Sequence, residues 1–359
     1  MRKPVLLSAV IFLTIITAFQ ACSKSRTSGG GSTPPPPPPA KSLTVSLDKT
    51  QIFGDGWETV TITVKDESNN DVTSSSSIYI GNVALSTNYF FANVPGSYKF
   101  KATRSGITSP EVTLTVTDPG PSPFAQKLIV EDYTGAWCGH CPRVGIKLDN
   151  YVANGHPNCL VIANHGPAGS ADPFIFSNHG TLANTFAVTG YPSVWIDRDF
   201  KWNEDLAQLD AQFTNRRPPL GIGFQTSLSG NMITAKVRVK FDVTTAVNLK
   251  LVVYLLEDGQ VYPQVNYNYY NLPNPIQNYV HNGILRRTAT DLFGDDIPAA
   301  SQTKGTIYEK TLLVDATGFN ISNCRLVAFV VQGPNNQNRK EKVVLNAQTV
   351  RAGENKDFD

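Results

Sequence analysis

The sequence predicts a multidomain protein in which a central α/β domain lies between two all-β domains. Hydrophobic and polar residues alternate with a period of two in residues 41–118 and again in residues 218–351, as they do in half-buried strands. Between these ranges, in residues 124–217, short apolar segments alternate with helical patterns, which is typical of an α/β sheet covered on both faces. The Pro- and Gly-rich residues 119–123 form a linker between the first two domains.

Residues 1–21 have the pattern of a signal peptide. Two basic residues precede an apolar segment, residues 5–19, which is too short for a membrane-spanning helix. Ala21 and Cys22 follow and look like a bacterial lipoprotein cleavage site, which implies that Cys22 is the lipidated N-terminus of the mature protein. The alternative is cleavage at a nearby bond, which would release a soluble protein.

Residues 22–40 predict a tether. They contain three consecutive glycines and the proline run Pro34 to Pro39, so a flexible piece is followed by a stiff polyproline II spacer. Such a segment lifts folded domains off a membrane. With Ser23 after the lipidated cysteine, it predicts a lipid anchor in the outer membrane and a periplasmic body, with display on the cell surface as the alternative.

The first all-β domain, residues 41–118, predicts a small sandwich. Leu43, Val45 and Leu47 alternate with polar residues, and three later runs repeat this pattern between turns. The domain contains no cysteine and no histidine cluster. It resembles the bacterial immunoglobulin-like modules that serve as spacers and adhesion units.

The central domain is expected to contain strand, helix, strand, helix, strand, strand and helix, in that order. The first helix is expected to begin at Cys138 and to end before Gly155 and Pro157. The other elements centre on residues 128–130, 160–163, 182–186, 194–196, 200–202 and 206–213.

Residues 218–351 predict a C-terminal β-sandwich, followed by a tail over residues 352–359. The nearly continuous apolar run of residues 249–256 suits a central strand. Residues 262–279 are rich in Tyr, Asn and Pro and predict a loop, whose clustered aromatic side chains could contact a glycan or a protein.

Cys138 and Cys141 are the residues most suggestive of chemistry. Two cysteines three apart at a helix start lie on the same face, so their sulfur atoms can form a disulfide. The positive end of the helix dipole favours a thiolate, so we expect Cys138 to be the nucleophile and Cys141 the resolving thiol. A protonated His140 between them would stabilise the thiolate further.

This motif, from Trp137 to Cys141, resembles the active site of thioredoxin-like proteins, and Cys-Gly-His-Cys is the form found in disulfide isomerases. The resemblance implies a thioredoxin-like fold for the central domain. It also implies that Asp132, six residues before Cys138, is the carboxyl group that moves the proton of the resolving cysteine. Glu131 is the alternative, because only one of two neighbouring strand residues can point inward.

A second segment supports this resemblance. Tyr191 and Pro192, in the sequence Thr-Gly-Tyr-Pro-Ser, resemble the segment that holds a cis proline opposite the dithiol in thioredoxins. The resemblance implies that Trp137, Tyr191 and Pro192 bind the substrate.

Other interpretations of the cysteines and histidines remain open. Cys138 and Cys141 could form a permanent disulfide in a non-catalytic thioredoxin fold, or join His140 or His165 in a metal site, although no ligand spacing supports a metal. The remaining cysteines and histidines predict less: Cys159 and Cys324 as core residues or a bridged pair, and His165, His179 and His281 as ordinary loop or surface residues. Asp291, Asp295 and Asp296 suit a solvated turn better than a Ca²⁺ site.

Residues 124–350 also resemble the outer-membrane-protein-28-related lipoprotein family of Gram-negative anaerobes. The matching features are residues 130–135, the Cys-x-x-Cys-Pro motif that ends at Pro142, residues 190–193 and residues 280–282. The resemblance implies architecture and location more than activity, and the immunoglobulin-like module is an addition to it.

These observations predict a membrane-tethered thiol–disulfide oxidoreductase or isomerase that acts on exported proteins outside the cytoplasm. No cofactor is expected. The formal net charge of +2 gives no electrostatic case for binding nucleic acid. The alternative is a non-catalytic binding or adhesion lipoprotein that reuses a thioredoxin fold.

Overall fold

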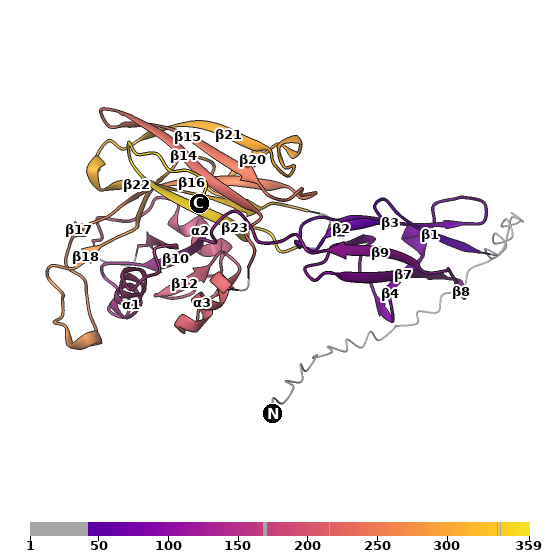
Figure 1. Cartoon of the computed structure of the whole chain (residues 1–359). Coiled ribbons are helices and arrows are strands. Elements are labelled where there is room, and N and C mark those ends of the chain that lie inside the picture. Colours follow the sequence, from indigo (N-terminus) through magenta and orange to yellow (C-terminus); the bar gives the residue numbers. More distant parts are fainter. Residues whose placement is uncertain (1–41, 168–170, 215, 336, 338) are drawn as a thin grey trace, which may run out of the picture. The chain divides into compact units, whose positions relative to one another are not determined.

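A computed structural model of the chain (Figure 1) describes residues 42–167, 171–214, 216–335, 337 and 339–359. The predicted signal peptide, the tether and Cys22 lie outside the described residues. Among the residues that are described, none of the helices is both long enough and apolar enough to cross a membrane.

Residues 42–118 form two β-sheets around one apolar core. One sheet has the order β1-β3-β6 and the other the order β2-β9-β7-β4-β5, with β8 paired to β7. Their bounds are β1 Leu43–Leu47, β2 Gln51–Phe53, β3 Val60–Asp66, β4 Ser77–Ile80, β5 Val83–Ala84, β6 Tyr89–Phe90, β7 Gly96–Arg104, β8 Ile107–Thr108 and β9 Val112–Thr117. Alternate residues such as Val60, Ile62 and Val64 point into the core, as the period-two pattern predicts.

The next elements follow the predicted order of strands and helices. They are β10 Leu128–Thr134, α1 Pro142–Ala153, β11 Cys159–His165, α2 His179–Thr185, β12 Ser193–Ile196, β13 Phe200–Lys201 and α3 Leu206–Thr214. β10 is central, parallel to β11 on one side and antiparallel to β12 on the other. Apolar clusters join α1 and α3 to one face of these strands and α2 to the other.

Some of the strands after α3 extend the sheet that contains β10, and others form a second sheet. The strands after α3 are β14 Leu220–Ser229, β15 Met232–Phe241, β16 Leu249–Glu257, β17 Gln260–Val261, β18 Val280–His281, β19 Ile284–Thr288, β20 Asp295–Ile297, β21 Ile307–Asp315, β22 Cys324–Gln332 and β23 Val344–Arg351. The sheet β14-β15-β21 packs on β16, β22 and β23 through a large apolar core. Figure 1 shows these two layers one above the other.

One sheet links the central and C-terminal regions. Its order is β13-β12-β10-β11-β19-β16-β22-β23, with β20 also paired to β16. The two regions meet where β11 pairs in parallel with β19, at Ala163 and Ile284. β16 is buried on both faces, as its continuous apolar run predicts. The sheet therefore continues across the boundary expected at residue 217, and strands are the main regular secondary structure of the described residues.

The expected start of the first helix is wrong. α1 begins at Pro142, and Cys138 lies in the turn that precedes it. Proline favours the first helical position, because its ring fixes a helical φ and its missing N–H would have no partner there. The boundary residue of α1 is therefore Cys141.

Candidate functional site

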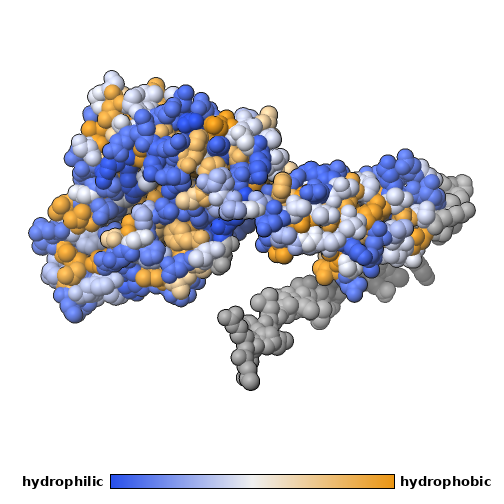
Figure 2. Space-filling view, viewed as in Figure 1, coloured by the Kyte–Doolittle hydropathy of each residue, from blue (hydrophilic) through white to orange (hydrophobic). Residues whose placement is uncertain are grey.

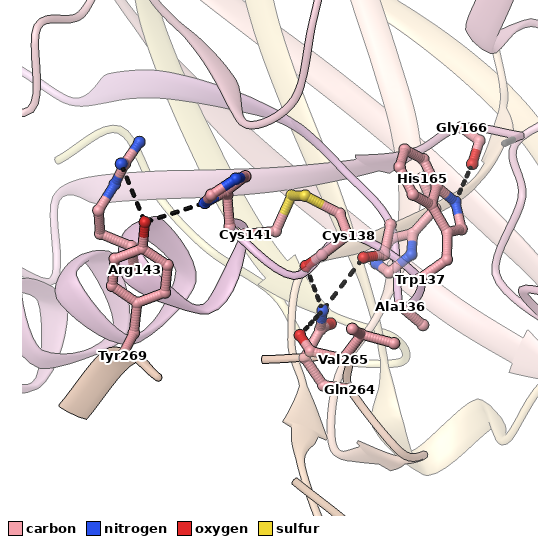
Figure 3. Close-up of a disulfide and its surroundings, with 12 residues drawn as sticks. Ala136, Trp137, Cys138, Cys141, Arg143, His165, Gly166, Gln264, Val265 and Tyr269 are labelled. Carbon is pink, nitrogen blue, oxygen red and sulfur yellow. Dashed lines mark hydrogen bonds between the residues drawn. A yellow bond between two sulfur atoms is a disulfide. The ribbon is translucent and has the colours of Figure 1, made fainter. Parts of the chain in front are cut away.

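The two cysteines form a disulfide in the turn between β10 and α1 (Figure 3). The turn is held by hydrogen bonds from the Cys138 N–H to the Gly135 carbonyl at 2.9 Å and from the Cys141 N–H to the Cys138 carbonyl at 3.2 Å. Cys138 is 4% exposed and Cys141 is 3% exposed. Because α1 begins only after Cys141, Cys141 lies nearer than Cys138 to the positive end of the helix dipole.

The two carboxyl candidates on β10 point to opposite faces of the sheet. The Arg198 guanidinium donates to both Glu131 carboxylate oxygens, at 2.9 and 2.7 Å, and also to the Tyr254 hydroxyl at 2.9 Å. Glu131 and Arg198 are 1% exposed each, so this is a buried ion pair with defined geometry. It directs Glu131 away from the dithiol.

Asp132 lies on the same face as the dithiol. A small cavity of about 40 Å³ is lined by Asp132 and Cys141 together. Within the described part of the chain, the Asp132 Oδ1 atom has no hydrogen-bond partner. Burial raises the pKa of Asp132 to about 8, and the negative charges of Asp149 and Glu204 add to this effect.

Three histidines are buried, which corrects the expectation that they are loop or surface residues. His165, His179 and His281 are 1%, 3% and 5% exposed. His281 packs against His165 at a ring-centroid distance of 5.5 Å, and burial, with the His165 charge, lowers the pKa of His281 to about 4. The ends of β11 and β18 carry these two side chains, and only the pairing of distant strands brings them together.

Asp172 is a site residue that no sequence pattern indicates. Its Oδ2 atom accepts a hydrogen bond from the Ala136 N–H at 2.7 Å and lies 2.9 Å from His165 Nδ1. Burial raises the pKa of Asp172, but these hydrogen bonds and the His165 charge outweigh it and hold the pKa below its ordinary value. Asp172 therefore anchors the start of the dithiol turn to β11.

Residues 262–279, which we call the strap, form the predicted loop between β17 and β18. The strap contains a short 3₁₀ helix, Tyr269–Asn271, and it runs along the dithiol turn. The Val265 N–H donates to the Ala136 carbonyl at 2.9 Å, and the Tyr267 N–H donates to the Gly139 carbonyl at 2.8 Å. Two backbone hydrogen bonds thus tie the strap to the turn.

Gln264 is a second residue that sequence reasoning missed. Its side-chain amide donates to the Cys138 carbonyl at 2.9 Å and to the Gly135 carbonyl at 3.2 Å, and Figure 3 shows the amide aimed at the backbone beside the disulfide. Gln264 is 2% exposed. A buried amide that satisfies two carbonyl groups fixes the position of the turn.

The strap also contacts His140, which is exposed. The Tyr269 hydroxyl lies 2.9 Å from His140 Nδ1, and the Tyr267 ring meets the His140 ring edge-on at 4.9 Å. The outer sides of Tyr267 and Tyr270 are exposed, at 57% and 48%. In Figure 2 the surface of this part of the molecule mixes hydrophobic and hydrophilic residues.

Trp137 and Tyr191, two of the predicted substrate-binding residues, lie together. Their rings meet edge-on at 5.2 Å, and the Trp137 indole N–H donates to the Gly166 carbonyl at 2.8 Å. The Tyr191 hydroxyl lies 2.7 Å from His179 Nε2. The peptide bond between Tyr191 and Pro192 is cis. Trp137, Tyr191 and Pro192 are all partly exposed.

The remaining candidates lie apart from this site. Cys159 and Cys324 are free and buried, and burial raises the pKa of their thiols to about 12 and about 11. The carboxylates of Asp295 and Asp296 pair with Lys310 at 2.7 Å and Lys250 at 2.6 Å, so lysines satisfy them. Residues 42–359, with the gaps given above, contain no group of three or more His, Cys, Asp or Glu side chains arranged to hold a metal ion.

Comparison with known proteins gives a family match and structural similarity. The family model described as outer membrane protein Omp28 matches residues 179–356, a range that includes the strap but begins after the dithiol. This match supports a relation to the Omp28-related family and an association with the outer membrane. No curated protein matches the chain.

Among solved structures, HBP35 of Porphyromonas gingivalis is similar, with 19% sequence identity and a TM-score of 0.52 over 64% of this chain and 76% of that chain. A structural-genomics protein from Agrobacterium tumefaciens is similar at 12% identity, with a TM-score of 0.41 over 66% of this chain and 98% of that chain. At these identities the likeness to HBP35 concerns the fold alone.

Proposed function

We propose that this chain, the second half of which matches the Omp28 family model, is a membrane-tethered thiol–disulfide oxidoreductase of thioredoxin type. Its substrates are exported proteins with thiols or disulfides. The observation that carries the proposal is the Cys138–Cys141 disulfide beside the buried, unpartnered carboxyl group of Asp132.

A buried carboxyl group without a partner is costly for folding, so its presence beside a disulfide calls for a chemical role. A permanent disulfide needs no acid or base. A resolving thiol does, because it attacks only as the thiolate. The pKa of Asp132, raised to about 8 by burial, is close to that of an ordinary thiol, which is about 8.5, so a proton can pass between them at little cost.

The exchange begins from the reduced Cys138–Cys141 pair. The Cys138 thiolate attacks a substrate disulfide, which forms a mixed disulfide and releases one substrate thiolate. Cys141 then gives its proton to Asp132 and attacks the Cys138 sulfur. The Cys138–Cys141 disulfide forms, the second substrate thiolate leaves, and the pair has lost two electrons to the substrate.

Substrate contact is assigned to the side of the turn that carries Trp137 and Tyr191. Both residues are partly exposed, and their rings pack together at 5.2 Å beside the dithiol. The strap contacts the turn through its backbone and through His140. The two aromatic rings therefore offer an apolar surface for a polypeptide next to Cys138.

The proposal includes the location. Cys22 carries the lipid, residues 22–40 are the tether, and the body is periplasmic. Cells grown with a labelled fatty acid should label the wild-type chain and not Cys22→Ser. Equal labelling of both chains would contradict the anchor without touching the redox chemistry.

The decisive test of the activity is trapping. Cys141→Ser leaves Cys138 unable to resolve its mixed disulfides, so exported proteins should be captured on it and released by a reductant. Cys138→Ser combined with Cys141→Ser is the matched control and should capture none. The absence of Cys138-dependent complexes would refute the exchange activity.

A second candidate function is favoured by the burial of the dithiol. With Cys138 and Cys141 only 4% and 3% exposed and held by the strap, the disulfide can also act as a permanent crosslink in a binding or adhesion protein. Titration against glutathione buffers separates the two functions. A pair that stays oxidised to potentials below about −300 mV behaves as a structural disulfide and favours the second candidate.

A further inference from the structure

The cavity behind Cys141 adjoins a second, larger space. The cavity of about 40 Å³ contains Asp132 and Cys141 in its wall. An open groove of about 890 Å³ lies beyond, between α1 and the end of the chain. Asp149, Val161 and Asn282 line both spaces, and Asp149 is the only carboxylic acid among the described residues that does so.

The position of Asp149 follows from the helix. Cys141, Gly145 and Asp149 are spaced by four residues along the start of α1, so they share one face. The Tyr279 hydroxyl occupies the space that a side chain at position 145 would fill, since a β-carbon there would lie 2.6 Å from it. Tyr279 thus covers the middle of this face, and it lines the small cavity together with Asp132 and Asp149.

The cavity is suited to a proton carrier. Its volume of about 40 Å³ is enough for a water molecule, which requires a polar wall and about 10–15 Å³. Asp132, 4% exposed, offers the unpartnered Oδ1 atom. Asp149 is exposed toward the groove and accepts a hydrogen bond from Asn282.

We propose that Asp149 relays the proton of Cys141 from Asp132 to the solvent of the groove, so that resolution of the mixed disulfide uses two carboxyl groups in series. This inference rests on the proposed exchange activity. Asp132 is the group that receives the proton from Cys141. Asp149 acts only through Asp132 and is therefore a positioning residue.

The charges around the two acids fit this direction. Although partial burial raises the pKa of Asp149 to about 6, its side chain is exposed to the groove, so we take it as ionised at neutral pH. It is therefore ready to accept a proton. The same negative charge contributes, after burial, to the raised pKa of Asp132.

Other ionisable groups face the acids from each neighbouring element. His165 on β11, His281 on β18 and Tyr279 in the strap line the cavity. Glu204 raises the pKa of Asp132 and Asp258 raises that of Asp149.

On the groove side Arg325 pairs with Asp258 at 2.9 Å, and Lys127 and Lys356 pair with Asp359 at 3.2 and 2.8 Å, while Arg351 also lines the groove. In the relay, only S–H and O–H bonds break and form. The Cys141 S–H bond breaks as the Asp132 O–H bond forms. Asp132 then gives its proton to a water in the cavity, the water passes a proton to Asp149, and Asp149 releases it to the groove. The electrons move only between sulfur atoms, from the pair to the substrate disulfide.

The test measures the resolving step alone. The purified, reduced full chain in detergent is mixed with the disulfide of thionitrobenzoate, which forms a mixed disulfide at Cys138. Attack by Cys141 then releases a second thionitrobenzoate, which is followed by stopped flow from pH 5 to 10. Asp149→Asn should lower the plateau rate about tenfold, less than the hundredfold or more expected from the primary acid–base group.

Asp149→Asn should also move the inflection of the pH profile to lower pH, because it removes the negative charge that raises the pKa of Asp132. Asp149→Glu should restore the plateau in part. Glu354→Gln, which removes a charge from the exposed groove rim, is the matched control and should leave both quantities unchanged. Asp149→Ser replaces Asp149→Asn if the latter fails to fold.

The outcomes separate the two proposals. A wild-type chain that never releases the second thionitrobenzoate overturns the exchange activity, and the relay with it. A working wild type with an unchanged Asp149→Asn profile overturns the relay alone. A lower plateau with an unmoved inflection also overturns the relay, because a purely structural role for Asp149 predicts that result.

Discussion

The Tyr267 ring of the strap lies where Gly139, inside the dithiol turn, lacks a side chain. A β-carbon on Gly139 would lie 2.4 Å from two atoms of this ring, far inside contact distance. The Tyr267 N–H also donates to the Gly139 carbonyl at 2.8 Å. The absence of a side chain between the two cysteines therefore allows the strap to approach the backbone of the turn.

Gly139→Ala should loosen this contact. The added methyl group forces the Tyr267 ring or the turn to move, and overpacking of this kind costs about 1–3 kcal/mol of stability. Chemical denaturation measures the loss, and cleavage within residues 262–279 by a protease should accelerate. Gly180→Ala in α2, where a β-carbon meets nothing within 4 Å, is the control and should be stabilising by about 0.5–1 kcal/mol. Equal behaviour of the two variants would contradict a close contact.

Gln264→Ala should destabilise the oxidised protein and expose Cys138. The change leaves the buried carbonyl groups of Gly135 and Cys138 without this amide donor, at a cost of about 1–3 kcal/mol. In the reduced protein, Cys138 should react faster with an alkylating agent. Gln277→Ala, at an exposed position of the same strap, should change neither stability nor alkylation rate. If alkylation is as slow in Gln264→Ala as in the control, Gln264 does not hold the turn.

The order of elements from β10 to α3 could be predicted because each carries its own local pattern. Apolar runs, helical spacing and turn residues depend only on neighbouring residues. The spacing of the two cysteines predicts too early a start for α1, because Pro142 is the stronger local signal for the first helical position. The choice of Asp132, Trp137, Tyr191 and Pro192 as site residues came from resemblance, not from local pattern.

The contacts of the strap could not be predicted. Gln264 lies 126 residues from Cys138 along the chain, and the two meet only because β19 extends the sheet beyond β11. A polar, aromatic loop has the same composition whether it faces solvent or a neighbouring turn. The burial of His165 and His281 has the same cause, because each becomes enclosed only when these distant strands pair.

Glu131→Gln should separate a structural role from a chemical one. Breaking a buried ion pair leaves the Arg198 charge uncompensated and costs about 3–5 kcal/mol, measured by denaturant unfolding. The pH profile of the resolving step should keep its inflection, since Glu131 faces away from the dithiol. Glu309→Gln, in an exposed pair with Lys236, should cost less than about 1 kcal/mol. A shifted inflection in Glu131→Gln would mean that Glu131 shares the role given to Asp132.

Asp132→Asn should slow exchange and stabilise the fold at neutral pH. The pKa of Asp132 is raised by burial from 3.8 to about 8, so the folded state binds more protons than the unfolded state between these values. The wild type therefore loses stability as pH rises through this window, and the variant does not. At pH 7 the variant should be more stable by at most about 4 kcal/mol, while resolution slows by about a hundredfold or more.

Urea unfolding of both proteins at pH 5 and pH 7 measures this difference. His281, whose pKa is lowered to about 4 mainly by burial, imposes the opposite slope, because the unfolded state takes up its proton first as the pH falls from about 6.5. That contribution is common to both proteins and cancels in their difference. Asp199→Asn, at a carboxylate 44% exposed, provides the control for loss of a charge. If the difference between wild type and Asp132→Asn is the same at both pH values, the Asp132 carboxyl group titrates normally, and the proton acceptor for Cys141 must be sought elsewhere.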